Sequence, residues 1–508
     1  MKNNNIALNV STAIVYEIVA IVAGLILPRL ILVNFGSTYN GIVTSITQFL
    51  SFVVLARSGI GGVSKVFLYK SLSENDINST SATMHATNDY MKKVSVFFLI
   101  ALIILSVVYP FIVHEDWIFT FCLVLICGLS SLAENYFGVS SMILLQADRK
   151  EYIISISNII VTILNVFVAY ALISFGSIFG SSLLLVVKLG TALVFCIKPF
   201  FLFFFIKKKY HLDDKAPYDK TLLRQKKDAF VHVLAEFIHR NTDIIVLTFF
   251  AGPIVVSIYG VYAIVTNGLR KLTGALTSNF EAVLGKEYCK EDKSSFLLLF
   301  NRFNFITVLI SVSVYLICAC LFCSFINVYT KDINDANYII PSFAILLCVG
   351  EFFDLLKTPY QFAIRVAGKF KETKFISVIE AALNIVVSIV LVNFFGIIGV
   401  AIGTVVAMFW RYIAYFIYCK KVLINISLFD EARLLFASLT SICLAIVLFL
   451  VFKPGYADSY YSWIVQALVV FLLVMVVMIV CFSTVCFKET KDLLTAFIRK
   501  FKRKESAL

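Results

Sequence analysis

The sequence predicts an all-α polytopic membrane protein of 14 transmembrane helices, arranged as two six-helix lobes and a C-terminal helix pair. Three observations predict this fold. Hydrophobic residues make up 60% of the 508 residues and charged residues only 15%, proportions far from those of soluble domains. Apolar runs of about 20 residues, the length of a helix that crosses a bilayer, recur along the whole chain. Lys and Arg concentrate in alternate loops, as the positive-inside rule expects.

Fourteen apolar segments are separated by short polar or glycine-containing stretches. The first is too long for a signal-peptide core and lacks a cleavage pattern after it, so we expect it to be retained. The predicted spans are 10–33, 40–66, 94–113, 117–145, 152–174, 179–205, 229–251, 254–272, 303–326, 339–364, 375–394, 397–418, 432–452 and 462–486. An even number of spans places both termini on the same side.

The orientation follows from the basic residues. Of 44 Lys and Arg, 35 lie in the N-terminus, the even-numbered loops and the tail, whereas only Lys331 and Lys453 lie in odd-numbered loops. Both termini are therefore predicted to be cytoplasmic. The formal charge of +13 fits loops that face an anionic leaflet, so nucleic acid is not an expected partner. The predicted outer loops are too short to hold an extracytoplasmic domain.

Two halves of the chain repeat at an offset of 219 residues. Asn165 and Asn384 occupy equivalent places in segments 5 and 11, and Gly41 is equivalent to Gly260. Each half holds an even number of segments, so the halves are predicted to share one orientation and an axis along the membrane normal. The expected domains are residues 1–206 for the N-lobe, 207–228 for a basic connector, 229–422 for the C-lobe, 423–487 for helices 13 and 14, and 488–508 for a basic tail.

Ionisable residues inside the predicted spans cost roughly 2.5 to 3.5 kcal/mol each on insertion scales, so they usually face a cavity or a partner. Segment 7 carries Glu236 and Asp243 on one helical stripe with two histidines, and segment 10 carries Glu351 and Asp354 on another. These four acids are the predicted coupling and gating residues. They would respond to H⁺ or Na⁺ and line a water-filled cleft between the lobes.

Arginines form a second predicted set because they lie at successive depths of the spans. They are Arg29, Arg57, Arg240 and Arg270. Guanidinium groups stay charged and match phosphate as bidentate donors, so these residues are predicted to bind an anionic, phosphate-bearing substrate. The alternative is that some pair with acids inside the membrane or extend to an interface.

Several chemistries are not predicted. No Gly-rich loop followed by Lys and Ser or Thr occurs, so the chain is not expected to be an ATPase. The histidines and Glu236 of segment 7 lack a further convergent ligand, so neither a metal site nor another cofactor is expected. No catalytic residues are predicted, and the chain is not expected to be an enzyme.

Three stretches carry a resemblance to a known family. They are Thr358-Pro359 followed by AGKFKETK, ALN and FGIIGVAIGT up to Thr404; GIGG at Gly59 with LYKSLSEND; and HRNTDIIVL at His239. In their order along the chain they resemble the polysaccharide transporters of the multidrug/oligosaccharidyl-lipid/polysaccharide exporter (MOP) superfamily, the Wzx-type flippases of bacterial capsule and O-antigen pathways.

The resemblance implies transport of undecaprenyl-diphosphate-linked oligosaccharide across the bacterial cytoplasmic membrane by alternating access. The lipid-linked oligosaccharide and membrane lipid are then the partners, together with a polysaccharide polymerase and glycosyltransferases. Two alternatives remain open. One is a cation-coupled multidrug extruder of the same superfamily, and the other is a membrane-bound glycan polymerase or acyltransferase.

The predicted topology can be tested with reporter fusions at Asp214 and Asn334. The charge distribution predicts that a fusion at Asp214 reports the cytoplasm and one at Asn334 reports the outside. Reports from the same side at both positions would contradict the arrangement of segments 7 to 9.

Overall fold

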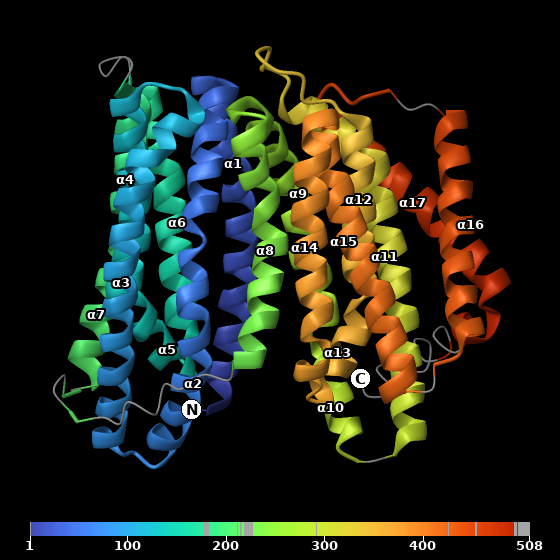
Figure 1. The fold of residues 1–508 in the computed structure, drawn as a ribbon, viewed down its shortest axis with the longest axis horizontal. Helices are drawn as coiled ribbons and strands as arrows, with labels where there is room; N and C mark the ends of the chain where they lie inside the picture. Colours follow the sequence, from blue (N-terminus) through green and yellow to red (C-terminus); the bar gives the residue numbers. More distant parts are fainter. Residues whose placement is uncertain are drawn as a thin grey trace. The chain divides into compact units, whose positions relative to one another are not determined.

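A computed structural model describes residues 2–176, 182–210, 212–213, 216–217, 227–290, 292–424, 426–452, 455–491 and 495; within its helices, the side chains of 2–6, 53–60, 227–233, 236, 239 and 450 are not described. The described part is helical, contains no strand (Figure 1), and divides into two compact units. Unit 1 comprises residues 1–237 and 244–260, and unit 2 comprises 238–243 and 261–508. Most of the predicted connector 207–228 and tail 488–508 lies outside the described residues.

Ten helices among the described residues are long and apolar enough to cross a membrane, which makes the chain a multi-pass membrane protein. The predicted number of 14 is not confirmed by this criterion. Predicted segment 2 lies partly in the first of these ten helices, and segments 7, 8 and 10 lie in helices that fail the criterion. Segment 10 fails because it is divided into α12 and α13, helices of 16 and 9 residues that are each too short to cross a membrane.

Unit 1 contains seven α-helices and one π-helical turn, among the residues described. They are α1 (Lys2–Leu50), α2 (Val53–Ser73), α3 (Ile77–Val113), α4 (Trp117–Ala133), η1 (Glu134–Gly138), α5 (Val139–Ala147), α6 (Glu151–Ser174) and α7 (Leu183–Tyr210). The sequence predicts a break between segments 1 and 2, and α1 consists of two helices joined across a kink in that stretch. The chain bends there at Gly36, whose φ of 83° is a conformation that glycine adopts readily.

Two helices are shared between the units, α8 (Lys227–Phe250) and α9 (Pro253–Thr277). Unit 2 continues with α10 (Asn279–Tyr288), α11 (Lys293–Tyr329), α12 (Pro341–Leu356), α13 (Thr358–Val366), α14 (Phe370–Phe395), α15 (Ile397–Tyr418), η5 (Cys419–Leu423), α16 (Leu428–Phe452) and α17 (Tyr460–Val485). Predicted segment 10 is not one continuous helix, because α12 ends before Lys357 and α13 begins after it. In the core of unit 2, buried Phe, Tyr and aliphatic side chains pack α11, α13, α15, α16 and α17 together.

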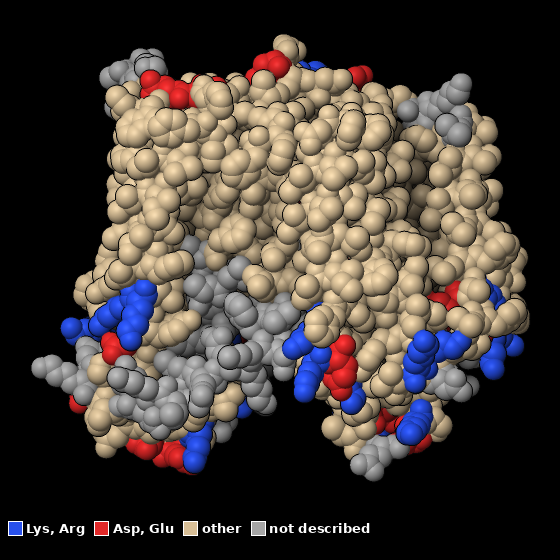
Figure 2. All heavy atoms as spheres, in the orientation of Figure 1, with Lys and Arg blue, Asp and Glu red and all other residues tan. Residues whose placement is uncertain are grey.

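Charged residues gather at the ends of the helices. On the face drawn in Figure 2, the visible Lys and Arg side chains lie mostly at one end of the helices, and the middle band that is not covered by grey atoms shows other residues. This is the distribution expected for helices whose central part lies in hydrocarbon.

Two asparagines predicted to be equivalent in the repeat have matching roles. Buried Asn165 on α6 donates from Nδ2 to the Thr191 carbonyl oxygen of α7 at 3.1 Å. Buried Asn384 on α14 donates from Nδ2 to Thr404 Oγ1 of α15, also at 3.1 Å. Each asparagine therefore joins a helix to the next one along the chain. The repeat remains a prediction, and these contacts agree with it.

The glycine pair of the repeat lies where α1 meets the start of α9. Asn40 Nδ2 donates to Ser257 Oγ at 2.8 Å, and a Cβ atom on Gly41 would lie 1.8 Å from the Pro253 carbonyl oxygen. A Cβ atom on Gly260 would lie 3.1 Å from the Thr44 methyl group. The absence of side chains at both glycines therefore allows these two helices to approach closely.

Replacing Gly41 by Ala should destabilise the protein, because the new methyl group collides with backbone that cannot move aside. We expect a loss of about 1 to 3 kcal/mol in the free energy of unfolding. The measurement is thermal unfolding of purified protein in detergent. Gly24→Ala on the same helix is the matched control, since a Cβ atom there meets nothing within 4 Å. Equal melting temperatures for both variants would show that the close contact is not required.

Candidate functional site

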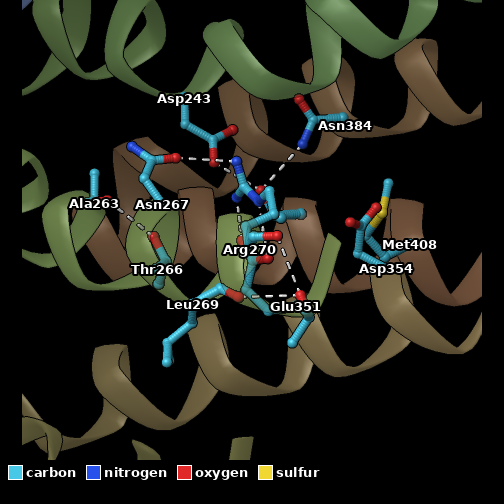
Figure 3. Close-up of polar contacts among 12 residues, drawn as sticks. Asp243, Ala263, Thr266, Asn267, Leu269, Arg270, Glu351, Asp354, Asn384 and Met408 are labelled. Atoms are coloured by element: carbon cyan, nitrogen blue, oxygen red, sulfur yellow. Dashed lines mark hydrogen bonds and ion pairs between the residues drawn. The ribbon is translucent and has the colours of Figure 1, made fainter. Parts of the chain in front are cut away.

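Unit 2 contains a polar network among helices that are otherwise apolar. It consists of Asp243 on α8, Arg270 on α9, Glu351, Asp354 and Lys357 at α12, Asn384 on α14, and Thr404 on α15. Figure 3 shows Asp243, Arg270, Glu351 and Asn384 converging from different helices, with Arg270 drawn between Asp243 and Glu351. Five segments far apart in the sequence thus contribute to one site.

Asp243 belongs to the first element of the network, together with Thr404 and Asn384. Its side chain is buried, and Oδ2 accepts a hydrogen bond from Thr404 Oγ1 at 2.9 Å. The same Thr404 oxygen accepts from Asn384 Nδ2, so α8, α14 and α15 are joined in one chain of hydrogen bonds. The Asn384 Oδ1 atom is buried and has no hydrogen-bond partner among the described residues. Carboxylate, hydroxyl and amide oxygens therefore meet in a small volume.

The close packing of α14 against α15 places these oxygens. Gly396 ends α14 with a φ of 55°, which lets α15 begin at once and run back along α14. At Gly403 a Cβ atom would lie 3.2 Å from the Asn384 carbonyl oxygen and closer still to Ser388. Glycine at position 403 therefore lets the following residue, Thr404, reach both Asn384 and Asp243.

Arg270 and Glu351 form the second element of the network. Arg270 Nε donates to Glu351 Oε2 at 3.0 Å, and a second guanidinium nitrogen contacts Oε1, so the pair is bidentate. Arg270 Nη1 also donates to Asn267 Oδ1 at 3.2 Å. Bidentate Arg–carboxylate pairs are among the stronger ion pairs in proteins. A phosphate bound by Arg270 would have to compete with Glu351.

Asp354 and Lys357 form the third element. Lys357 Nζ contacts the Asp354 carboxylate and lies 3.8 Å from the Met408 sulfur. Lys357 is buried at the break between α12 and α13. The charge of Asp354 is thus already compensated by a residue on the same stretch of chain.

A separate, fully buried ion pair lies along the same two helices, α14 and α15. Arg411 Nη1 donates to Glu380 Oε2 at 2.8 Å, and the two side chains are only 1% and 0% exposed. Arg411 also donates to the Tyr415 hydroxyl at 3.3 Å. Breaking such a pair is costly because it leaves one charge buried alone. We therefore assign it a structural role.

Four of the eight predicted site residues, Asp243, Arg270, Glu351 and Asp354, are found together in the network. The other four are not placed in it: Arg29 is half-buried on α1 in unit 1 and Arg240 is exposed on α8, whereas the side chains of Arg57 and Glu236 lie outside the described residues. The succession of arginines along a cleft therefore remains a prediction.

Thr404 and Asn384 were not predicted as site residues. Each is a single uncharged polar residue in an apolar segment, where helix packing is the ordinary explanation. Thr404 is nevertheless the last residue of the FGIIGVAIGT stretch. The glycine spacing of that stretch was the available signal for a close helix contact that ends at the Thr404 hydroxyl.

The network contains oxygen atoms of the kinds that small hard cations favour. Alkali and alkaline-earth cations favour carboxylate, hydroxyl and carbonyl oxygens, and Asp243, Thr404 and Asn384 supply one of each kind. Protonation of Asp243 would be the other way to neutralise its charge. Among the described residues, no group of three or more His, Cys, Asp or Glu side chains is placed to hold a metal ion.

Comparisons with known proteins identify the fold. No family model matches the sequence, and no curated protein matches it either. A solved structure of the lipid II flippase MurJ in an inward closed conformation matches with a TM-score of 0.67 and 17% identity, covering 93% of this chain and 99% of that one. An inward-facing multidrug resistance transporter of the MATE family of the MOP superfamily matches with a TM-score of 0.62 and 13% identity, over 80% of this chain and 94% of that one. An outward-facing MATE transporter matches with a TM-score of 0.52 and 13% identity, over 82% and 92%.

These similarities show that the chain has the polytopic helical fold of MurJ and the MATE transporters. The matching proteins are transporters and a flippase, not enzymes. At these identities the likeness concerns the fold and does not identify a substrate.

Proposed function

We propose that the chain is a flippase that moves undecaprenyl-diphosphate-linked oligosaccharides across the bacterial cytoplasmic membrane by alternating access. The observation that carries the proposal is the extent of the match to a lipid II flippase, which includes 93% of this chain and 99% of the flippase. The match to the MATE transporter covers only 80% of this chain. The additional length is comparable to that of α16 and α17 together.

The substrate would be anionic because its lipid and sugar are joined by a diphosphate. Arg29, Arg57, Arg240 and Arg270 are proposed to contact this diphosphate at different stages of its passage. Guanidinium groups suit the task because they remain charged and bind phosphate oxygens in pairs. The translocated oligosaccharide would be used in the synthesis of bacterial capsule, O-antigen or exopolysaccharide. Both termini of the chain are proposed to lie in the cytoplasm.

A cation-coupled multidrug extruder is the second candidate. The MATE-like fold and the buried carboxylate of Asp243 favour it, since an acidic site suits cationic drugs. The basic residues inside the predicted spans favour the anionic lipid instead. The charge of the transported molecule therefore distinguishes the two candidates.

We further propose that Asp243, Thr404 and Asn384 form the site that couples transport to Na⁺ or H⁺. Binding a cation would neutralise a carboxylate buried between α8 and α15, and it would supply a partner for the buried Asn384 oxygen. A cation that binds one conformation better than the other shifts the alternating-access equilibrium by that difference. Asp354, whose carboxylate contacts Lys357, is the second candidate.

Proteoliposomes test the substrate. A fluorescent undecaprenyl-diphosphate trisaccharide is incorporated, and a membrane-impermeant quencher reports the fraction in the outer leaflet over time. We expect protein-dependent movement of the lipid, and no uptake of ethidium under the same ion gradients. Movement of ethidium without movement of the lipid would instead identify a multidrug extruder.

Replacing Asp243 by Asn should remove the ion dependence of transport, because the variant has no carboxylate to neutralise. Initial rates are compared across Na⁺ gradients and across pH gradients. Asp430→Asn, the same substitution at an exposed residue of α16, is the control and should keep the wild-type dependence. A normal ion dependence in the Asp243→Asn protein would exclude this residue from coupling.

A further inference from the structure

Unit 1 contains a polar cavity that the proposed function has not used. Its volume is about 340 Å³, within the range of small-ligand sites. Residues near the end of α1, on α4 and η1, and on α7 surround it. They are Thr47, Leu50, Ser51, Cys127, Ser130, Ser131, Glu134, Asn135, Lys188, Thr191, Ala192 and Phe195.

Lys188 supplies a positive charge to this cavity. It lies on α7, which is long and apolar enough to cross a membrane. Its amine has no hydrogen-bond or ion-pair partner among the described residues. A lysine in a transmembrane segment is costly unless something compensates its charge, so an anion bound in the cavity would be stabilised by it.

Glu134, the carboxylate that lines the cavity, is already compensated from another direction. Its Oε1 atom accepts from Lys198 Nζ at 3.2 Å, and Lys198 lies further along α7. With Glu134 and Lys198 balanced, the Lys188 charge is the net charge of the cavity. The electrostatic preference is therefore for an anion.

Neutral hydrogen-bond donors lie beside this charge. The hydroxyl groups of Ser130 and Ser131 on α4 line the cavity and have no hydrogen-bond partner among the described residues. The hydroxyls of Thr47 and Thr191 differ, because they donate to the carbonyl groups of Val43 and Lys188. One ammonium and two hydroxyls are thus available, a donor set suited to an oxyanion.

The backbone of α4 is altered at the same place. Directly after Ser130 and Ser131, the helix changes into the π-helical turn η1, which begins at Glu134. Such turns are rare and occur often at functional sites, where the extra residue changes the direction of nearby side chains. This geometry is independent of the charge of Lys188 and identifies the same cavity.

We propose that this cavity binds the phosphate groups of the lipid-linked substrate, with Lys188, Ser130 and Ser131 as donors. The proposal rests on the proposed flippase function and adds a substrate subsite inside unit 1. Lysine binds phosphate as a point charge, and the serine hydroxyls supply directed hydrogen bonds. Lys188, Ser130 and Ser131 then contribute to recognition of the diphosphate, independently of the arginines.

Ligand binding to the purified full-length protein tests the proposal. The probes are farnesyl diphosphate, farnesol and inorganic pyrophosphate, titrated at constant ionic strength. The variants are Lys188→Met, Lys188→Arg and the double variant Ser130→Ala/Ser131→Ala. The matched control is Lys208→Met, which removes the same charge from an exposed position of α7. Thermal unfolding of each variant checks that it is folded.

We expect Lys188→Met to weaken farnesyl diphosphate binding by about 10- to 100-fold, the effect of losing a charged hydrogen bond. Lys188→Arg should restore most of it, the double serine variant should weaken it less than Lys188→Met, and Lys208→Met should match the wild type. Farnesol binding should not change in any variant. Wild-type affinity in a folded Lys188→Met protein would overturn the proposal.

Comparing pyrophosphate with farnesyl diphosphate shows whether the bound anion belongs to a lipid or to a soluble compound. Weaker binding of pyrophosphate than of farnesyl diphosphate, with both reduced by Lys188→Met, supports a lipid-linked ligand. Equal affinity for the two would assign the cavity to a soluble phosphate compound and overturn the proposal. Failure of the proposed subsite can be distinguished from failure of the proposed flippase function. If the wild type moves lipid-linked oligosaccharide and Lys188→Met binds farnesyl diphosphate normally, only the subsite is wrong.

Discussion

The cost of an uncompensated charge in hydrocarbon is the constraint on which the rest of this structure depends. Inside a bilayer no water replaces a missing partner, so each ionised side chain needs one within the protein or from a ligand. Among the described residues, ion pairs within the predicted spans meet this requirement: Arg411 with Glu380, Arg270 with Glu351, Lys357 with Asp354, and Lys198 with Glu134. They connect or brace the helices that carry them. The Lys188 amine and Asn384 Oδ1 have no partner among the described residues, and they belong to the two sites that we propose to bind ligands.

The predicted repeat reproduces a contact between neighbouring helices, but it does not reproduce the charged residues of the two sites. At the offset of 219 residues, Asn165 and Asn384 have comparable roles, yet Asp243 corresponds to Gly24 and Lys188 to Ala407. The acidic site of unit 2 and the basic cavity of unit 1 therefore have no equivalents in the other half. If the halves arose by duplication, each has since acquired its own polar groups, one set suited to a cation and the other to an anion.

Much of the fold could be predicted from the sequence because spanning helices need long apolar runs. Segments 2, 7, 8 and 10 are not confirmed as separate spans by length and hydropathy, and segment 10 is divided at Lys357 into two short helices. Asp243, Arg270, Glu351 and Asp354 could be selected because an acid or arginine inside a span is unusual. The pairing of Arg270 with Glu351 could not, because it depends on which helices pack together. Thr404 was overlooked for a related reason, as its role arises only from the contact of α15 with α8.

The role of charge compensation is tested most directly by comparing the thermal stability of two purified variants, Lys198→Met and Lys188→Met. Both remove one positive charge from α7, but among the described residues only Lys198 is paired with a carboxylate. We predict that Lys198→Met lowers the melting temperature, with a loss of about 1 to 3 kcal/mol for the partner left behind, whereas Lys188→Met does not lower it. A larger loss of stability in Lys188→Met than in Lys198→Met would contradict the claim that paired charges maintain the fold and the unpaired one serves a ligand.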